Sequence, residues 1–241
     1  MHVALLTPPA VETPLDLCNR FSIFRCMKVY GDYYGQGYAH LEGLLSPLLA
    51  REELALLKAE IDRSQLPAAA FMKPGVMLRQ PTFELHSSQL RSLKAFQWGL
   101  TSTMNEITQR NLLPTYCYFR VYRSEDVCWV HSDRFACEHS LSLTLGYSDD
   151  ATWPFEIGLD RQTVNRPVAH DFANDAYATV HMRPGDAILY QGIHYRHGRV
   201  TPNPNRWSAH LFLHWVDSAG AFKNELFDGA APSPQPDFFP A

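Results

Sequence analysis

The sequence predicts an α+β fold in which N-terminal helices buttress a jelly roll, that is, a double-stranded β-helix. Two observations carry this prediction. The N-terminal part contains two segments whose apolar residues recur at roughly helical spacing. From Thr115 onward, short runs rich in aromatic and aliphatic residues alternate with turn clusters, and about eight such runs are present, which is the strand number of a jelly roll.

The first helix is predicted over about residues 46–63. Ser46 is placed as the N-cap and Pro47 as the first helical residue, where its missing N–H costs nothing. A second helix is predicted to begin near Ser88, and Pro114 closes that segment because proline cannot continue a helix. The residues before the first helix are rich in proline, glycine and tyrosine, which is typical of loops and short edge strands.

The second half of the chain is predicted to be β. Turn clusters such as Ser148-Asp149-Asp150 and Arg183-Pro184-Gly185-Asp186 separate the predicted strands. The strands are expected near residues 116–123, 127–131, 139–147, 153–158, 178–182, 186–190, 195–200 and 207–216.

A chain of 241 residues is one ordinary domain's worth of sequence, so a single domain is expected over residues 1–241. Residues 1–114 would supply loops and helices that pack on the core. Residues 115–217 would form the jelly-roll core, and residues 218–241 a Pro-rich tail at the surface.

Composition limits the classes of partner. Hydrophobic residues make up 46% of the chain and no stretch is long enough to cross a membrane, so a soluble protein without a membrane partner is expected. The net charge of −4 disfavours nucleic acid as a partner. The five cysteines show no C-x-x-C spacing, which argues against a disulfide framework or a zinc ribbon. The start of the chain lacks the pattern of a secretory signal, so a cytoplasmic location is expected.

Three residues are candidate metal ligands: His131 and Asp133, separated by one residue, and His197 further along the chain. On an extended segment the side chains at i and i+2 point to the same side, so His131 and Asp133 can reach one ion. His197 would complete the set from a distant strand. Two imidazoles and one carboxylate on one face of an octahedron leave three open positions, which is diagnostic of non-haem Fe(II) oxygenases.

An H-x-D pattern by itself is a weak signal, because a chain with 11 histidines is expected to contain a chance match. A surface histidine followed by a turn-forming aspartate would explain it as well. The context favours a metal site, because a predicted strand runs up to the motif, another follows it, and His197 lies in a third. His194 precedes His197 by three residues and faces the opposite way on an extended segment, so it is not expected to be a ligand.

The stretch from about Pro114 to Asp217 resembles the Fe(II)/2-oxoglutarate-dependent dioxygenase superfamily, and within it the prolyl-4-hydroxylase-like branch. The segments that carry the resemblance are YCYFRVYRSEDVCWVHSDRFACEHSLSLTLGY, PGDAILYQGIHYRHGRV and NRWSAHLFLHW. It implies an enzyme that holds Fe(II) through His131, Asp133 and His197 and uses 2-oxoglutarate and O₂. The products would be an oxidised substrate, succinate and CO₂.

The resemblance also implies which residues bind 2-oxoglutarate. The arginine that pairs with its distal carboxylate falls on Arg206, nine residues after His197, and the planar guanidinium suits this task. Arg199 is the alternative, because it shares the strand face of His197. Tyr122 and Tyr147 match the positions of tyrosines that hydrogen-bond the co-substrate, although ordinary aromatic packing would also explain them.

The primary substrate is less constrained. Asp133 argues for hydroxylation or a related oxidation, because halide-transferring relatives replace this carboxylate by a small residue. Arg120, Arg134 and Tyr118 are candidate substrate contacts, and a small metabolite, such as an amino acid or a natural product derived from one, is the expected substrate. Two alternatives remain open: a peptidyl hydroxylase acting on a protein partner, and a cupin-like metal-binding module without 2-oxoglutarate chemistry. The oligomeric state is not determined by the sequence.

Overall fold

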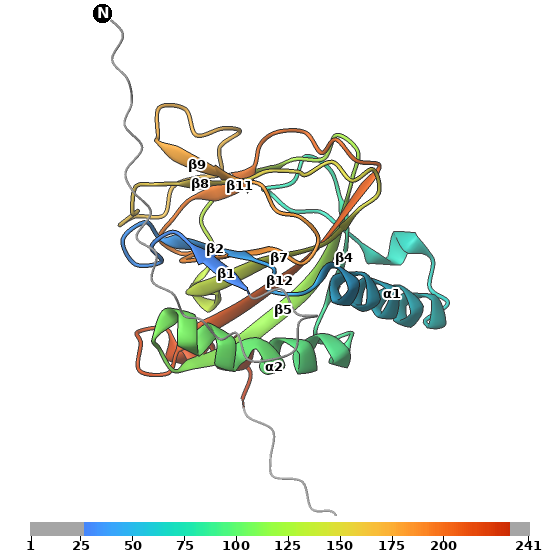
Figure 1. Cartoon of the computed structure of the whole chain (residues 1–241), viewed down its shortest axis with the longest axis horizontal. Helices are drawn as coiled ribbons and strands as arrows, with labels where there is room; N and C mark the ends of the chain where they lie inside the picture. The colour runs from blue at the N-terminus through green and yellow to red at the C-terminus, as the bar shows by residue number, and fades with distance from the viewer. Residues whose placement is uncertain (1–26, 232–241) are drawn as a thin grey trace, which may run out of the picture.

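The computed structural model describes residues 27–231 (Figure 1). Cys18, Cys26 and the last part of the Pro-rich tail lie outside the described residues. The described helices are α1 (Pro47–Arg63) and α2 (Arg91–Thr108). The described strands are β1 (Lys28–Tyr30), β2 (Tyr38–Glu42), β3 (Met72–Lys73), β4 (Thr82–His86), β5 (Leu112–Arg123), β6 (Cys128–His131), β7 (His139–Tyr147), β8 (Phe155–Gly158), β9 (Tyr177–Val180), β10 (Ala187–Tyr190), β11 (His197–Arg199) and β12 (Trp207–Asp217).

The strands form two antiparallel sheets that face one another, as in a jelly roll (Figure 1). The larger sheet has the order β1-β2-β10-β7-β12-β5-β4-β3, and the smaller one has the order β6-β11-β8-β9. Strands that are consecutive along the chain alternate between the sheets from β5 to β8, which is what brings the ends of distant segments together across the interior.

Each of the eight predicted strands has a counterpart, from β5 to β12. β5 begins at Leu112, four residues before its predicted start, and the other strand bounds agree with the prediction to within two residues. The four strands β1 to β4 extend both edges of the larger sheet. β3 and β4 were not predicted. β4 owes its place to pairing with β5, where Glu84 lies opposite Arg120, and this pairing is a tertiary interaction.

Both helices pack on the outer face of the larger sheet (Figure 1). Ser46 caps α1, because its side chain accepts a hydrogen bond from the backbone N–H of Leu49, and Pro47 follows as the first helical residue. Leu57 of α1 and Leu93 and Met104 of α2 are buried in the hydrophobic core between the helices and the sheet. The helices therefore cover one face of the larger sheet and leave its other face to the interior of the jelly roll.

The described part of the C-terminal segment packs on the core. A short irregular helix, Lys223–Gly229, follows β12. Phe222 stacks on Phe135, and Asp228 forms an ion pair with Arg134 at 2.5 Å. The tail was predicted from residue 218 onward as a surface end, and residues 218–231 are more structured than that prediction because these contacts fix them.

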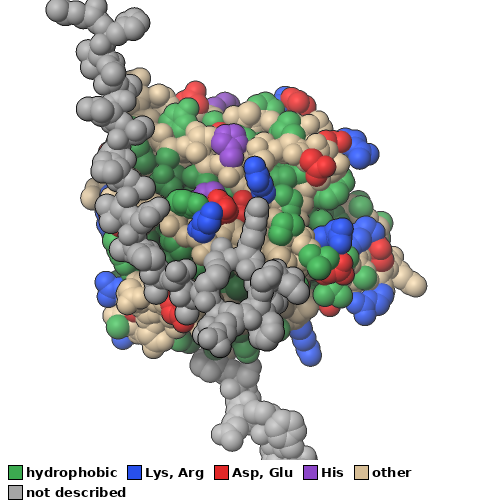
Figure 2. Space-filling view, in the orientation of Figure 1, with side chains coloured by type: hydrophobic (Ala, Val, Ile, Leu, Met, Phe, Trp, Pro, Cys, Tyr) green, Lys and Arg blue, Asp and Glu red, His purple; other side chains and the backbone are tan. Residues whose placement is uncertain are grey.

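Within residues 27–231, no helix combines the length and the apolar character needed to cross a membrane. On the face shown in Figure 2, Lys and Arg side chains are interspersed with Asp and Glu, in keeping with the small net charge of −4.

Candidate metal centre

The three predicted ligands come together at one end of the smaller sheet. His131 is the last residue of β6 and His197 is the first residue of β11, and the two strands pair so that these residues lie opposite each other. Asp133 follows His131 by two residues, just past the end of β6. The pairing of β6 with β11 thus brings together residues that are distant in the sequence.

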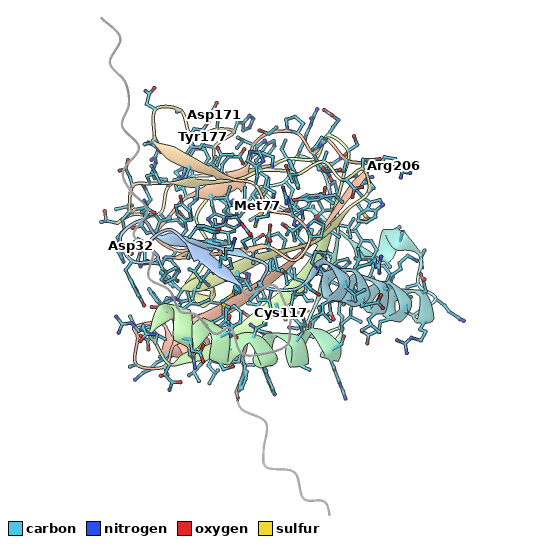
Figure 3. All side chains as sticks on the ribbon, in the orientation of Figure 1. Asp32, Met77, Cys117, Asp171, Tyr177 and Arg206 are labelled. Carbon is cyan, nitrogen blue, oxygen red and sulfur yellow. The ribbon has the colours of Figure 1, made fainter. Side chains whose placement is uncertain are left out.

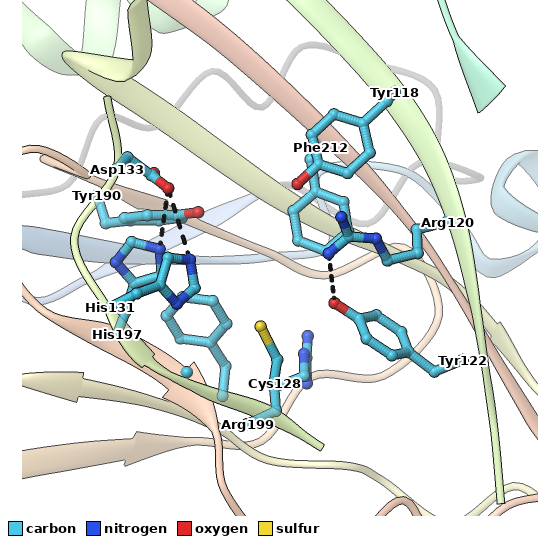
Figure 4. Close-up of a pocket in the computed structure, with 12 residues that line it drawn as sticks. Tyr118, Arg120, Tyr122, Cys128, His131, Asp133, Tyr190, His197, Arg199 and Phe212 are labelled. Carbon is cyan, nitrogen blue, oxygen red and sulfur yellow. Dashed lines mark hydrogen bonds and ion pairs between the residues drawn. The ribbon is translucent and has the colours of Figure 1, made fainter. Parts of the chain in front are cut away.

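The ligand atoms are close enough to bind one ion. Asp133 Oδ1 lies 3.6 Å from His131 Nε2 and 3.5 Å from His197 Nε2 (Figure 4). The ligand atoms of the three residues all lie within 4.8 Å of one another. This spacing suits a central ion bonded at about 2 Å to each atom.

Both imidazole rings are held with the same nitrogen facing the centre. His131 Nδ1 donates to the carbonyl of Trp129 at 2.7 Å, and His197 Nδ1 donates to the carbonyl of Tyr195 at 2.9 Å. Because a carbonyl oxygen only accepts, Nδ1 carries the proton and Nε2 keeps its lone pair for a metal. Hydrogen bonds of this kind are the usual outer support of metal-binding histidines.

The charges of the triad also suit a divalent cation. Burial, followed by the nearby His197, lowers the pKa of His131 to about 4, so this ring is neutral at pH 7. Burial would raise the pKa of Asp133, but His197 and His131 outweigh it and hold the pKa below its ordinary value. A neutral His131 and an ionised Asp133 are the forms that metal binding requires.

Asp133 is fixed on two further sides. Its backbone N–H donates to the carbonyl of Gly192 at 2.9 Å, and its Oδ2 accepts a hydrogen bond from Ser140 Oγ at 3.2 Å. Gly192 packs so closely that a Cβ atom there would overlap Asp133 Oδ2 and would lie 2.8 Å from Ser140 Oγ. The turn between β10 and β11 therefore requires glycine at this position.

The triad opens into a small pocket. The pocket lies between the two sheets (Figure 4). The residues that line it are Tyr118, Arg120, Tyr122, Cys128, His131, Asp133, Phe155, Tyr190, His197, Gly198, Arg199 and Phe212.

Arg206 was predicted to bind the 2-oxoglutarate carboxylate, and the structure places it elsewhere. Its side chain is 78% exposed and pairs with Asp149 at 3.4 Å. Figure 3 shows it at the edge of the molecule, and it does not line the pocket. The segment that contains Pro202 and Pro204 turns between β11 and β12. The spacing of nine residues from His197 therefore does not make the Arg206 side chain point into the pocket.

Arg199, the alternative, lies inside the pocket. It follows His197 by two residues on β11 and is only 2% exposed. Nη1 donates to the carbonyls of Trp153 and Pro154 at 2.6 and 3.1 Å. Nε and Nη2 are buried and have no hydrogen-bond partner among residues 27–231. A buried guanidinium with unused donors is costly unless a ligand supplies an acceptor.

Arg120 also lines the pocket, but its charge is already balanced. Nε and Nη2 donate to the buried Glu84 carboxylate, and Nη1 donates to the Tyr122 hydroxyl at 3.0 Å. Tyr118 lies beneath the guanidinium, whose central carbon is 4.9 Å from the ring centroid. The structure therefore brings three predicted residues, Arg120, Tyr118 and Tyr122, to one wall of the pocket, opposite the triad (Figure 4).

The other predicted residues do not reach the pocket. Tyr147 donates its hydroxyl to the carbonyl of Met182 at 3.1 Å. Arg134 pairs with Asp228 and lies over the Tyr116 ring, half-exposed. His194 is not among the lining residues either, as expected from its position. Tyr147 and Arg134 are thus explained by packing and pairing on the scaffold.

Tyr190, which was not predicted as a site residue, lies next to the triad. Tyr190, at the end of β10, is buried, and its ring centroid lies 4.5 Å from that of His197. Its hydroxyl points into the pocket (Figure 4), and burial raises its pKa well above the ordinary value, so it stays protonated. Alternation along a strand tells which residues share a face. Which face of β10 is turned toward the pocket depends on the register of β10 in the sheet, and the sequence does not supply that register.

Solved structures with this architecture include three informative matches. A non-haem α-ketoglutarate-dependent carbocyclase, SnoK, from nogalamycin biosynthesis matches with a TM-score of 0.61 and 10% identity over 84% of this chain and 91% of its own. HygX from Streptomyces hygroscopicus, with nickel and 2-oxoglutarate bound, matches at 0.55 with 11% identity, over 78% and 85%. A Pseudomonas putida prolyl-4-hydroxylase matches at 0.51 with 18% identity, over 77% and 95%.

The chain has the fold of the 2-oxoglutarate-dependent oxygenases. No protein-family model matches the sequence, and a search of curated proteins finds no match. At 10–18% identity the shared property is this oxygenase fold, so the chemistry rests on the residues of the pocket.

Within this oxygenase fold, the donor set fits a ferrous ion. Two imidazole nitrogens and a carboxylate oxygen are borderline and hard donors, and they are the set that non-haem Fe(II) oxygenases use. The orphaned nitrogens of Arg199 fit a carboxylate in the same pocket. The pocket thus offers a place for a metal and a place for an anion side by side.

Proposed function

We propose that this protein is a non-haem Fe(II)- and 2-oxoglutarate-dependent dioxygenase that oxidises a C–H bond of a small metabolite. One observation carries the proposal. A His-Asp-His set with free Nε2 atoms shares a buried pocket with Arg199, whose Nε and Nη2 have no partner among the described residues.

His131, Asp133 and His197 hold the iron, and Arg199 binds the distal carboxylate of 2-oxoglutarate. Arg199 suits this role better than Arg120, because Glu84 already neutralises Arg120 whereas no described carboxylate lies within ion-pair distance of Arg199. Trp153 and Phe155 lie 4.9 and 5.4 Å from the Arg199 guanidinium and keep it out of water. Iron with 2-oxoglutarate bound would let O₂ act as the oxidant: one oxygen atom would enter the succinate formed from 2-oxoglutarate with release of CO₂, and the other would enter the hydroxylated substrate.

The remaining wall would position the substrate. Tyr118 and Tyr190 direct their hydroxyls into the pocket (Figure 4), while Phe155 and Phe212 give it apolar surface that excludes water. Hydroxylation is the expected outcome, because Asp133 occupies the ligand position that halide transfer would need to be open. An amino acid, or a natural product derived from one, is the proposed substrate class. HygX with hygromycin B bound is a fold neighbour that holds a small molecule, which supports a metabolite over a protein partner as the substrate.

The proposal is tested by anaerobic titration of the metal-free protein with Fe(II) and then 2-oxoglutarate. A weak visible charge-transfer band reports the chelate. We expect the band in the wild type and in Arg206→Ala, with the same 2-oxoglutarate affinity, because Arg206 is exposed. In Arg199→Ala the affinity should fall about 10- to 100-fold, the usual loss for a hydrogen bond between charged groups.

Each other outcome has a defined meaning. Tight iron binding without a band in the wild type would support a cupin-like metal-binding module instead. Unchanged affinity in Arg199→Ala would refute the role of Arg199. Once the band is established, succinate release should rise with free amino acids or related metabolites, and a rise only with peptides would identify a peptidyl hydroxylase.

A further inference from the structure

The interior face of the larger sheet carries a polar strip beneath the pocket. On β7 and β12, the leucines at alternate positions belong to the core under the helices, so the residues between them face the interior. These residues pair across the two strands as Ser140 with His214, Ser142 with Phe212, and Thr144 with His210. All six are buried.

Ser140 connects His214 to the metal centre. Ser140 Oγ lies 2.9 Å from His214 Nδ1 and 3.2 Å from Asp133 Oδ2. It also lies 3.2 Å from the carbonyl of Cys137. The single hydroxyl proton goes to the carboxylate, because hydrogen bonds to an ionised acceptor are about twice as strong as neutral ones. Ser140 therefore accepts from His214 Nδ1–H and donates to Asp133.

The two carboxylate oxygens of Asp133 have different surroundings. Oδ1 faces the Nε2 atoms of His131 and His197, as the dashed lines of Figure 4 show. Oδ2 faces Ser140 on one side and the backbone of Gly192 on another. Only one oxygen is directed at the position where the two imidazoles converge.

We infer that Ser140 and His214 form a positioning pair that keeps Asp133 a one-oxygen metal ligand, an inference that rests on the function proposed above. A carboxylate can also bind a metal through both oxygens. On a facial triad the second oxygen would take one of the three positions left open. By holding Oδ2, the pair keeps that position free for 2-oxoglutarate.

A different use of the same residues is a second metal site. The ligand atoms of Asp133, Cys137 and His214 lie within 4.8 Å of one another. Some of these atoms are already engaged, since Ser140 bridges Asp133 Oδ2 and His214 Nδ1, and the Cys137 thiol lies 3.2 Å from the Tyr116 hydroxyl. His214 Nε2, in contrast, has no hydrogen-bond partner among residues 27–231. We therefore treat the second ion as an outcome of the test.

The test compares Ser140→Ala with Ser142→Ala. Ser142 lies two residues along β7, is equally buried, and has a hydroxyl without a partner among residues 27–231, so it controls for removal of a buried hydroxyl. Ser140→Thr keeps the hydroxyl and should restore the contact. For each variant we would measure iron stoichiometry and affinity, and 2-oxoglutarate affinity from the charge-transfer band, after circular dichroism has shown a wild-type fold.

In Ser140→Ala we expect one iron per chain, bound nearly as tightly as in the wild type, because the released second oxygen of Asp133 would bind the metal and offset the lost hydrogen bond. The same oxygen would take a position that 2-oxoglutarate needs, so 2-oxoglutarate affinity should fall by about tenfold or more. Ser142→Ala and Ser140→Thr should behave as wild type, and His214→Phe should weaken 2-oxoglutarate binding in the same direction as Ser140→Ala. Wild-type 2-oxoglutarate affinity in Ser140→Ala would refute the positioning role. Two metal ions per wild-type chain, falling to one in Cys137→Ser, would replace it with the second-site explanation. A wild type that shows no band at all would instead refute the proposed function.

Discussion

At the scale of single residues, the metal centre depends on where the protons sit on two imidazole rings. The carbonyls of Trp129 and Tyr195 place those protons on Nδ1 of His131 and His197, so both Nε2 atoms are available without any rearrangement. In each case the acceptor carbonyl lies two residues before the histidine. The same local geometry, repeated on β6 and β11, therefore prepares both ligands.

Removal of a ligand should abolish metal binding without unfolding the chain. In His131→Ala and Asp133→Ala we expect iron affinity to fall by more than the roughly 10- to 100-fold that loss of an outer-shell partner costs, and turnover to disappear. His194→Ala is the matched control, because this histidine lies near the triad in sequence but does not line the pocket. Isothermal titration with Fe(II), together with thermal melts, would check this. Full iron-dependent activity in either ligand variant would contradict the assignment.

At the scale of elements, the turn between β10 and β11 positions a metal ligand, as the strands β6 and β11 do. Gly192 accepts the Asp133 N–H through its carbonyl and leaves room for the Asp133 side chain because it has no Cβ. This turn therefore sets the position of a ligand that belongs to another part of the chain.

A methyl group at Gly192 should displace Asp133. In Gly192→Ala we expect metal affinity to fall by about 10- to 100-fold, because the added Cβ would overlap Asp133 Oδ2 and crowd the Cys137 carbonyl at 2.9 Å. Gly99→Ala is the control, since Gly99 is exposed on α2 with open space around it. That substitution should raise the free energy of unfolding by about 0.5–1 kcal/mol and leave metal binding unchanged. Equal metal affinity in both variants would show that the turn can move to accommodate the added methyl group, and it would contradict this prediction.

At the scale of the whole molecule, buried neutral histidines should make the metal-free protein sensitive to acid. Burial lowers the pKa of His139 to about 4, and burial lowers the pKa of His214 to about 4 as well. Burial also lowers the pKa of His210 well below its ordinary value. In the unfolded chain these rings bind protons near pH 6.5, so the unfolded state gains protons first as the pH falls.

The free energy of unfolding should therefore decline between about pH 6.5 and pH 4, where the unfolded chain binds more protons than the folded one. His139 alone would contribute a loss of about 3 kcal/mol across that interval. In His139→Asn we expect lower stability at pH 7, because the hydrogen bond to the Tyr33 hydroxyl is disturbed, but a shallower decline with acid. Urea unfolding of the wild type and of His139→Asn at several pH values, with a chelator present, would measure how the free energy of unfolding of each protein depends on pH. Parallel pH dependences would exclude His139 as a contributor.

The local pattern of the sequence was enough to predict the elements of the core. Strands β5 to β12 and the start of α1 at Ser46 were predictable because alternation, turn residues and capping act over a few residues. The grouping of His131 with Asp133 was predictable for the same reason, since two residues of extended chain fix their common side. The sequence by itself therefore determined the two helices, the order of strands β5 to β12 and the three candidate ligands, but not β3 and β4.

Only the tertiary structure decided which arginine faces the pocket and what holds Asp133. Arg206 lies beyond a turn with two prolines, where spacing along the chain no longer gives direction, whereas Arg199 keeps the face of His197 because only one strand residue separates them. Ser140, Gly192 and Tyr190 join the site through strand pairing and turns. The position of such residues depends on register between segments distant in the sequence, and register is set by packing of the whole molecule rather than by any local pattern.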